Sequence, residues 1–469
     1  MPDLFYLGQG KGYLMVFSSL TFLVFFIPIF LFIYFAVPES NIKIRNLVLL
    51  VFSLFFYSAG EPIWFVLILF SASMDCIIGI FMERCRGTPL AKLLLVLSLC
   101  SSLGLLILFK YTEFLLGVVG ISVAFAPVLP IGISFYTFQT MSYSIDVYRG
   151  NIKAQRNPIA FLTFVAMFPQ LVAGPIIIYR DIEDRLTSRT TTRKMISDGI
   201  TRFAMGLGKK VIFANHAGMI ANELLGAPYL STLGIWLGSL MFAFQIYFDF
   251  SGYSDMAIGL AKILGFEFKE NFNYPYIAKS VTDFWRRWHI SLGRFFRDYL
   301  YIPLGGNRKR TVFNIMFVWM VTGFWHGASW NFILWGLYFG FALLLEKYVL
   351  RRLLEKLPAF FQHSYLLLIV LFGWVIFYFV ELSELYAAAS RFFGIGGELW
   401  DYRALDLLLG NIWIIPVLAI FSTKKPIEIW QHLRYNFPAS EAVINATILG
   451  VSSILLIGQT FSPFIYFRF

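Results

Sequence analysis

The sequence predicts an all-α membrane protein that crosses the bilayer many times. Of its 469 residues, 58% are hydrophobic and only 14% are charged, whereas soluble domains carry about 25% charged residues. The apolar residues are also gathered into stretches close to the length of about 20 residues that one spanning helix requires. Together these observations exclude an ordinary soluble globular protein.

Apolar stretches follow one another along the chain, and several are broken by Gly or Pro. We therefore expect about ten to twelve membrane helices, with re-entrant and interfacial helices among them. Residues 15–469 are expected to form a single membrane domain. Residues 1–14, which carry no structural signal, are expected to be an N-terminal extension, with Met15 as an alternative start. The stretches are residues 16–37, 46–60, 62–82, 93–109, 114–145, 158–179, 210–226, 229–250, 312–345, 364–380, 410–421 and 442–463.

The first apolar stretch, Val16 to Val37, has no small-residue cleavage site of the A-x-A type, so we interpret it as a retained span and not a signal peptide. Basic residues follow in alternate loops, first Lys43 and Arg45 and then residues 84–92. By the positive-inside rule this pattern places the N-terminus outside. The same rule accounts for the net charge of +11. No basic segment outside the bilayer has a fold of its own, so we expect no nucleic-acid partner.

The segment FPQLVAGP, residues 168–175, carries two prolines and a glycine in apolar surroundings. Non-helical backbone at membrane depth is tolerated only where it is buried in protein or lines a water-filled cavity. We therefore expect a re-entrant segment here.

A polar-aromatic segment, SVTDFWRRWHISLGRFFRDYL, runs from Ser280 to Leu300. Ser280 and Asp283 have the spacing of a capping box. At 100° per residue the aromatic side chains share one face and the arginines share the other. We therefore predict one interfacial helix, with His289 at the rim of its aromatic face and a turn after it at residues 303–306.

The run from Val312 to Leu345 contains no Asp, Glu, Lys or Arg, but it contains His326. The run is too long for one ordinary span and too short for two full spans. A break near residues 327–329, which are Gly, Ala and Ser, explains this length and places His326 at a bend beside a cavity. Ionisable side chains at membrane depth usually mark a pathway or a reaction centre.

His326 and His289 are the candidate catalytic residues, because a neutral imidazole in an aromatic pocket can act as a general base at neutral pH. The segment between them has room for an interfacial helix, a turn and a half-span that bring both to one chamber. The alternative interpretation is two hydrogen-bonded core or interface histidines. No HExxH motif is present, and Cys76, Cys85 and Cys100 lack the spacing of a zinc site or a disulfide framework. We expect no bound metal and expect the cysteines to be apolar filler.

Two further polar groups lie in apolar stretches. Asp249 and Asp255, in FQIYFDFSGYSDMAIG, are expected to orient a histidine, pair with an arginine or accept from substrate hydroxyls. Gln139 and Asp146, in SFYTFQTMSYSIDVYRG, form a polar-aromatic strip. For both groups the alternative is a polar network that packs helices together.

The lysines and arginines between Arg286 and Arg310 have two interpretations. They receive the phosphates of a cytoplasmic cofactor or an acidic carrier protein, or they only follow the positive-inside rule. The sequence contains no GxSxG elbow, no P-loop and no dinucleotide fingerprint. A covalent serine mechanism is therefore not indicated.

Three segments resemble the membrane-bound O-acyltransferase family, in particular its bacterial alginate O-acetylase branch: DFSGYSDMAIG, NFNYPYIAKSVTDFWRRWHISLGRFFRDYLYIPLGGN and FVWMVTGFWHGASWNFILWG. The segments MVFSSLTFLVFF, SFYTFQTMSYSIDVYRG and FPQLVAGPI resemble that branch too, so the resemblance covers nearly the whole chain after residue 14. It implies that His326, in WHG, is the catalytic base and that His289, in RRWHISL, is the second active-site histidine. It also implies many helices around a central cavity that reaches both membrane faces.

The resemblance implies acyl transfer from a cytoplasmic thioester, such as acetyl-CoA, toward hydroxyls of an extracytoplasmic polysaccharide such as alginate or peptidoglycan. No cofactor is expected to stay bound. The expected location is the cell inner membrane, and the expected partners are membrane lipid, an acyl donor or carrier protein, and a partner acetyltransferase that makes the final transfer.

Three alternatives remain open at the level of the sequence. The first is transfer of D-alanine to teichoic acid by the same family. The second is a proton-coupled transporter in which His326, Asp249 and Asp255 form a relay. The third is a non-catalytic scaffold for a polysaccharide-secreting complex.

Overall fold

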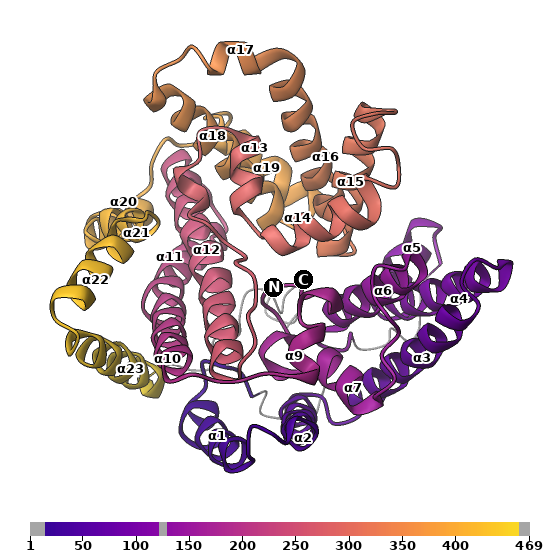
Figure 1. The fold of residues 1–469 in the computed structure, drawn as a ribbon. Helices are drawn as coiled ribbons and strands as arrows, with labels where there is room; N and C mark the ends of the chain where they lie inside the picture. The colour runs from indigo at the N-terminus through magenta and orange to yellow at the C-terminus, as the bar shows by residue number, and fades with distance from the viewer. Residues whose placement is uncertain (1–14, 122–128, 459–469) are drawn as a thin grey trace. The chain divides into compact units, whose positions relative to one another are not determined.

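Helices are the only regular elements that the computed structural model shows in the residues it describes, 15–121 and 129–458 (Figure 1). A helix satisfies its backbone N–H and C=O groups within one segment, and a chain of this composition needs that in a bilayer. The all-α prediction is confirmed. The predicted extension, residues 1–14, lies outside the described residues, and the single domain over residues 15–469 stays a prediction.

Seven helices of the described chain are long and apolar enough to cross a membrane. An eighth span results if α20 (Tyr402–Asn411) and α21 (Ile414–Phe421), which are bent by 63°, cross together. The predicted ten to twelve segments also include shorter apolar helices, such as Phe22–Ala36. The protein is therefore a multi-pass membrane protein. The seven long helices are Ile42–Gly60, Phe65–Arg84, Pro89–Val118, Thr232–Ile263, Trp330–Leu354, Ala359–Tyr378 and Ser440–Ile457.

The chain divides into two compact units. The first contains the chain up to Phe203 together with Met256–Lys269, and the second contains Ala204–Asp255 and the chain from Glu270 onward. The helices that begin in the first unit are η1 (Phe22–Phe26), α1 (Ile27–Ala36), α2 (Ile42–Gly60), α3 (Phe65–Arg84), α4 (Pro89–Leu106), η2 (Ile107–Tyr111), α5 (Thr112–Val118), α6 (Ile133–Arg149), α7 (Pro158–Ala166), α8 (Phe168–Leu171), η3 (Tyr179–Asp181), α9 (Glu183–Thr187) and α10 (Arg193–Gly208).

Phe168 lies at the centre of the aromatic core of the first unit. Its ring packs against rings from η1, α1 and α2, with centroid distances of 5.2 Å to Phe30 and 5.7 Å to Phe56. The backbone N–H of Phe168 donates to the Ser53 hydroxyl at 3.0 Å. After the short helix α8 the chain is not helical until Tyr179, and it is buried throughout. Residues 172–175 of the predicted re-entrant segment are therefore irregular and buried, while residues 168–171 form α8. The re-entrant path itself stays a prediction.

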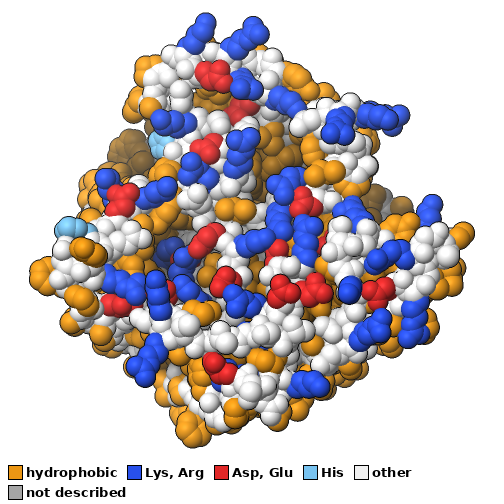
Figure 2. Space-filling view, viewed as in Figure 1, with side chains coloured by type: hydrophobic (Ala, Val, Ile, Leu, Met, Phe, Trp, Pro, Cys, Tyr) orange, Lys and Arg blue, Asp and Glu red, His pale blue; other side chains and the backbone are white. Residues whose placement is uncertain are grey.

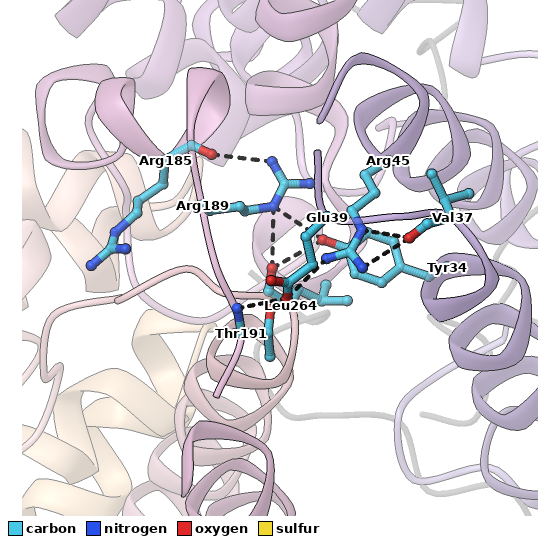
Figure 3. A network of polar contacts seen from close by, with 8 residues as sticks. All are labelled: Tyr34, Val37, Glu39, Arg45, Arg185, Arg189, Thr191 and Leu264. Carbon is cyan, nitrogen blue, oxygen red and sulfur yellow. Dashed lines mark hydrogen bonds and ion pairs between the residues drawn. The ribbon is translucent and has the colours of Figure 1, made fainter. Parts of the chain in front are cut away.

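Two buried arginines hold the ends of helices in the first unit (Figure 3). Arg45 donates two hydrogen bonds, at 3.0 and 2.9 Å, to the carbonyl of Val37, the residue that caps the C-terminal end of α1. Arg189 donates to the Leu264 carbonyl at 3.2 Å and to the Tyr34 hydroxyl at 3.0 Å. A positive charge at the C-terminal end of a helix is favourable because it opposes the partial negative charge there. These arginines therefore stabilise the fold of this unit.

A large hydrophobic cluster forms the core of the second unit, and aromatic rings dominate it where α13, α16 and α18 meet. Trp288 and Trp374 pack with ring centroids 4.9 Å apart. The helices of this unit are η4 (Lys209–Ala214), α11 (Asn215–Leu225), α12 (Thr232–Ile263, which ends in the first unit), η5 (Pro275–Ile277), α13 (Val281–Arg287), α14 (Ile290–Phe296), η6 (Arg297–Tyr301), α15 (Thr311–His326), α16 (Trp330–Leu345), η7 (Glu346–Leu350), α17 (Arg351–Leu354), α18 (Ala359–Tyr378), α19 (Leu382–Phe392), α20, α21, α22 (Lys425–Asn436) and α23 (Ser440–Gly458).

Candidate active site

The second unit contains a cavity of about 860 Å³ that both predicted histidines line. His326 reaches it from the end of α15, and His289 from the junction of α13 and α14. Side chains of η6, α16, η7, α17 and α18 complete its wall. The prediction that one chamber receives both imidazoles is thus confirmed by the fold.

His326 lies at the predicted break. Helix α15 ends at His326, residues 327–329 are not helical, and α16 begins at Trp330. The His326 ring is 7% exposed and makes edge contacts with the rings of Trp335 at 5.1 Å and Phe377 at 5.4 Å between centroids. A side chain at Gly327 would collide with the Phe332 ring, 2.2 Å from the position of a Cβ. Gly327 therefore allows the tight turn that places His326 at the cavity wall.

Helices α15 and α16 pack side by side as a hairpin through two glycines (Figure 1). A Cβ at Gly323 would lie 2.1 Å from the Phe332 carbonyl oxygen, and one at Gly336 would lie 2.2 Å from the Trp319 carbonyl oxygen. Only residues without a side chain permit this approach of the two backbones. The hairpin places His326 and the wall residue Trp335 in ring contact.

The prediction of one continuous interfacial helix from Ser280 to Leu300 is wrong. The segment forms α13 and α14, separated at Trp288 and His289. His289 has a left-handed backbone with φ of +44°. Such a conformation is uncommon outside glycine and persists where the surroundings enforce it. The predicted cap at the start is confirmed, since the Ser280 hydroxyl accepts from the Asp283 N–H at 3.0 Å.

The break at His289 is held by the chain around Asn271. The Ile290 N–H donates to the Asn271 carbonyl and the Asn273 N–H donates to the Arg287 carbonyl, both at 2.9 Å. The Asn271 side chain contacts His289, with 3.1 Å between Oδ1 and Nδ1. These bonds replace the helical hydrogen bonds that a continuous helix would make. Periodicity within the segment contains no signal for them, because Asn271 lies outside it.

Burial keeps His289 neutral. The side chain is 2% exposed, and burial lowers its pKa from the ordinary value of 6.5 to about 3. Phe250 packs edge-on against the ring at 4.7 Å between centroids. At neutral pH the imidazole therefore has one nitrogen that donates and one that accepts.

Glu346 fixes the other end of α13. Its carboxylate accepts from the backbone N–H groups of Val281 and Thr282, and from the Thr282 hydroxyl at 2.7 Å. A carboxylate at the first turn of a helix satisfies N–H groups that have no partner within the helix. Glu346 is buried and lines the cavity. It was not predicted from the sequence.

Replacing Glu346 with Ala is expected to destabilise the protein by about 3 kcal/mol, because the buried Val281 N–H and the partly buried Thr282 N–H lose a charged acceptor. Glu346→Gln should cost less, since an amide oxygen still accepts. Thermal unfolding of the detergent-purified variants measures both effects. Glu428→Ala, at an exposed position of α22, is the control and should unfold like the wild type. A wild-type unfolding temperature for Glu346→Ala would contradict the anchoring role.

Five basic side chains line the same cavity as the histidines. Two of them, Arg286 and Arg297, belong to the predicted basic group between Arg286 and Arg310. Figure 2 shows that Lys and Arg side chains also gather over α17, at the top of the view. Among the described residues of the wall, only Glu346 and Glu355 oppose these charges. The five are Lys279, Arg286, Arg297, Lys347 and Arg351.

Asp249 and Asp255 do not line the cavity. Asp249 pairs with Lys210 at 2.5 Å and Asp255 pairs with Lys209 at 2.7 Å, so each aspartate has a lysine partner in η4. Both pairs join α12 to η4. This favours the interpretation as a polar network that packs helices.

Gln139 and Asp146 are also absent from the cavity wall. Both are buried in α6 of the first unit. Asp146 accepts from Asn151 at 2.9 Å and lies 3.9 Å from the Arg180 guanidinium. The packing interpretation holds for Asp146.

Comparison with known proteins places these features in a family. The model of the membrane-bound O-acyltransferase family matches residues 133–389, which include the whole cavity wall. A probable alginate O-acetylase of Pseudomonas putida is 38% identical over 97% of this chain and 100% of the relative. A peptidoglycan O-acetyltransferase of Helicobacter pylori is 32% identical over 98% of each. A teichoic acid D-alanyltransferase of Streptococcus thermophilus is 30% identical over 47% of the chain and 58% of the relative. The chain belongs to the membrane-bound O-acyltransferase family and is a multi-pass membrane O-acyltransferase.

Proposed function

We propose that this protein moves an acetyl group from a cytoplasmic thioester toward hydroxyls of an extracytoplasmic polysaccharide such as alginate or peptidoglycan. The observation that carries the proposal is the shared cavity of His289 and His326. The full-length similarity to an alginate O-acetylase and a peptidoglycan O-acetyltransferase supports the choice of acyl group and acceptor. We also propose that the membrane is the inner membrane of the cell.

In the proposed reaction His326 is the general base. Its imidazole removes the proton of the acceptor hydroxyl as the oxygen attacks the thioester carbonyl carbon. A carbon–oxygen bond forms and the carbon–sulfur bond breaks. The proton passes from the imidazolium to the departing thiolate, so the products are an ester and a thiol. The cavity holds the two reactants together, which removes much of the entropic barrier.

Indole N–H groups are candidates for stabilising the negative oxygen of the transition state. Trp285 and Trp335 line the cavity, and their rings lie 5.5 Å apart between centroids. Both indole nitrogens are buried and have no hydrogen-bond partner in the part of the chain that the structure describes. A donor that is already desolvated gains a strong interaction when charge develops beside it.

The basic wall of the cavity fits a phosphate-bearing donor. Acetyl-CoA carries phosphates, and so does the prosthetic group of an acyl carrier protein, which is itself acidic. Arginine and lysine are the side chains that proteins use for phosphates. We propose that Lys279, Arg286, Arg297, Lys347 and Arg351 bind this end of the donor, and that they face the cytoplasm, as the positive-inside rule favours.

Replacing Arg286 and Arg351 with Gln is expected to raise the KM for acetyl-CoA about tenfold or more, with a smaller change in kcat, because phosphate binding is lost. The KM for S-acetyl-N-acetylcysteamine, a thioester without phosphates, should not change. Radiolabel transfer in proteoliposomes measures both donors. Equal effects on the two donors would contradict a phosphate site, and transfer only from a D-alanyl carrier protein would contradict acetyl transfer.

Transfer of D-alanine is the second candidate, because the chain is similar over about half its length to teichoic acid D-alanyltransferases. Acetyl transfer is favoured because its relatives align over nearly the entire chain at higher identity. The transporter relay is not supported, since Asp249 and Asp255 are paired with lysines away from the cavity. A partner acetyltransferase that receives the acetyl group and makes the final transfer stays part of the proposal.

A further inference from the structure

Asn271 is a buried amide placed beside His289. It is fully buried and lies between α12 and the α13–α14 junction. Its Oδ1 atom lies 3.1 Å from His289 Nδ1, 3.2 Å from the Ser291 backbone nitrogen and 2.8 Å from the Ser291 hydroxyl. Its Nδ2 atom donates to the Ser254 hydroxyl of α12 at 3.1 Å. Each end of the amide therefore has a defined partner.

The Ser291 backbone fixes which end of the amide faces His289. A backbone N–H group can only donate, so the atom that it contacts must be the amide oxygen. The same oxygen lies against His289 Nδ1. An amide oxygen can only accept, so Nδ1 must carry a hydrogen. In the neutral imidazole the lone pair is then on Nε2.

The backbone holds this geometry. Asn271 and His289 are joined by the bond from the Ile290 N–H to the Asn271 carbonyl. The left-handed φ of +44° at His289 sets the direction in which its side chain leaves the chain. Ser254 supports the amide from the opposite side. This gives a role to the polar motif DFSGYSD of α12, whose two aspartates do not reach the cavity.

We propose that Asn271 is a positioning residue that holds His289 in the tautomer whose Nε2 accepts a proton during acyl transfer. The inference rests on the proposed function, because it specifies how the second histidine acts there. In this state His289 cannot polarise the thioester carbonyl through Nε2, since that atom has no hydrogen to donate. It contributes by accepting a hydrogen bond or a proton, and it donates to the thiolate only after it has been protonated.

The decisive variant is Asn271→Asp. A carboxylate accepts from the His289 and Ser291 groups as the amide does, and the Ser254 hydroxyl can turn to donate to its second oxygen. The geometry is kept, but a negative charge now lies beside Nδ1 and raises the pKa of His289. The pKa of the His289 imidazole, followed by ¹⁵N NMR of histidine-labelled protein in detergent, should rise by about one pH unit or more. Asn271→Ala should lower kcat about 100-fold through misplacement of the imidazole.

Ser291→Ala is the matched control. It removes a hydroxyl that donates to the Asn271 oxygen and lies 3.5 Å from His289 Nδ1, but it leaves the bond between Asn271 and His289. The pKa of its His289 should stay at the wild-type value. An unchanged His289 pKa in a folded Asn271→Asp protein would overturn the inference, as would wild-type kcat in Asn271→Ala. Thermal unfolding in detergent shows which variants are folded. If Asn271→Ala does not fold, the Asp variant still decides the question, because it keeps the hydrogen bonds.

His289→Ala separates this inference from the proposed function. If His289→Ala transfers acetyl groups at the wild-type rate, the proposed role of His289 fails. If it is inactive while both Asn271 variants behave like the wild type, only the positioning role fails.

Discussion

His326→Ala is expected to lower acetyl transfer by about 10²- to 10⁴-fold, the range that a general base contributes. The loss should appear in kcat, because the imidazole acts on the proton in the transition state more than on binding. Initial rates of radiolabel transfer by purified protein in proteoliposomes provide the measurement. His326→Gln should be equally poor, since an amide does not accept a proton at neutral pH.

His432→Ala is the matched control. His432 is exposed on α22, where it contacts Asn436, and it does not line the cavity. This variant should retain the wild-type rate. A folded His326→Ala protein that transfers acetyl groups at the wild-type rate would contradict the assignment of the base.

Gly323→Ala and Gly336→Ala are expected to destabilise the protein by about 3 kcal/mol each, because the added methyl group meets backbone and not a movable side chain. The expected Cβ positions lie 2.1 and 2.2 Å from carbonyl oxygens of the facing helix. The two helices of the hairpin must separate, and His326 then moves relative to Trp335. The unfolding temperature and kcat should therefore fall together.

Gly104→Ala in α4 is the control for a helical glycine, since a Cβ there meets nothing within 4 Å. Ala is the better helix former by about 1 kcal/mol, so this variant should be as stable as the wild type or slightly more stable. Wild-type stability in Gly323→Ala would contradict the close packing of α15 against α16.

The hairpin at His326 could be predicted from the sequence because its signal is local. The uncharged run has a length that fits neither one span nor two, and its small residues lie together next to the histidine. The irregular backbone after Leu171 has a local signal too, since prolines and a glycine interrupt an apolar stretch. Composition and the length of the apolar stretches were enough for the all-α membrane fold.

The break at His289 could not be predicted from the sequence, because the forces that cause it come from another part of the chain. The segment from Ser280 to Leu300 has the periodicity of one helix, and the backbone bonds to Asn271 and Asn273 override it. The role of Glu346 could not be predicted for a similar reason. Its carboxylate accepts from the Val281 N–H, which lies 65 positions away in the sequence. Lys347 and Arg351 follow the uncharged run that ends at Leu345, where a basic residue has the ordinary explanation of the positive-inside rule.

The central claim is that acyl transfer takes place in the cavity that His289 and His326 share. A cryo-electron microscopy structure of the protein with acetonyl-CoA, a thioether that cannot transfer its acyl group, tests this claim most directly. We predict that the ketone lies in the cavity, within hydrogen-bond reach of Trp285 or Trp335, with His326 beside it and the phosphates against Arg286 and Arg351. An analogue bound elsewhere, with the cavity unoccupied, would contradict it.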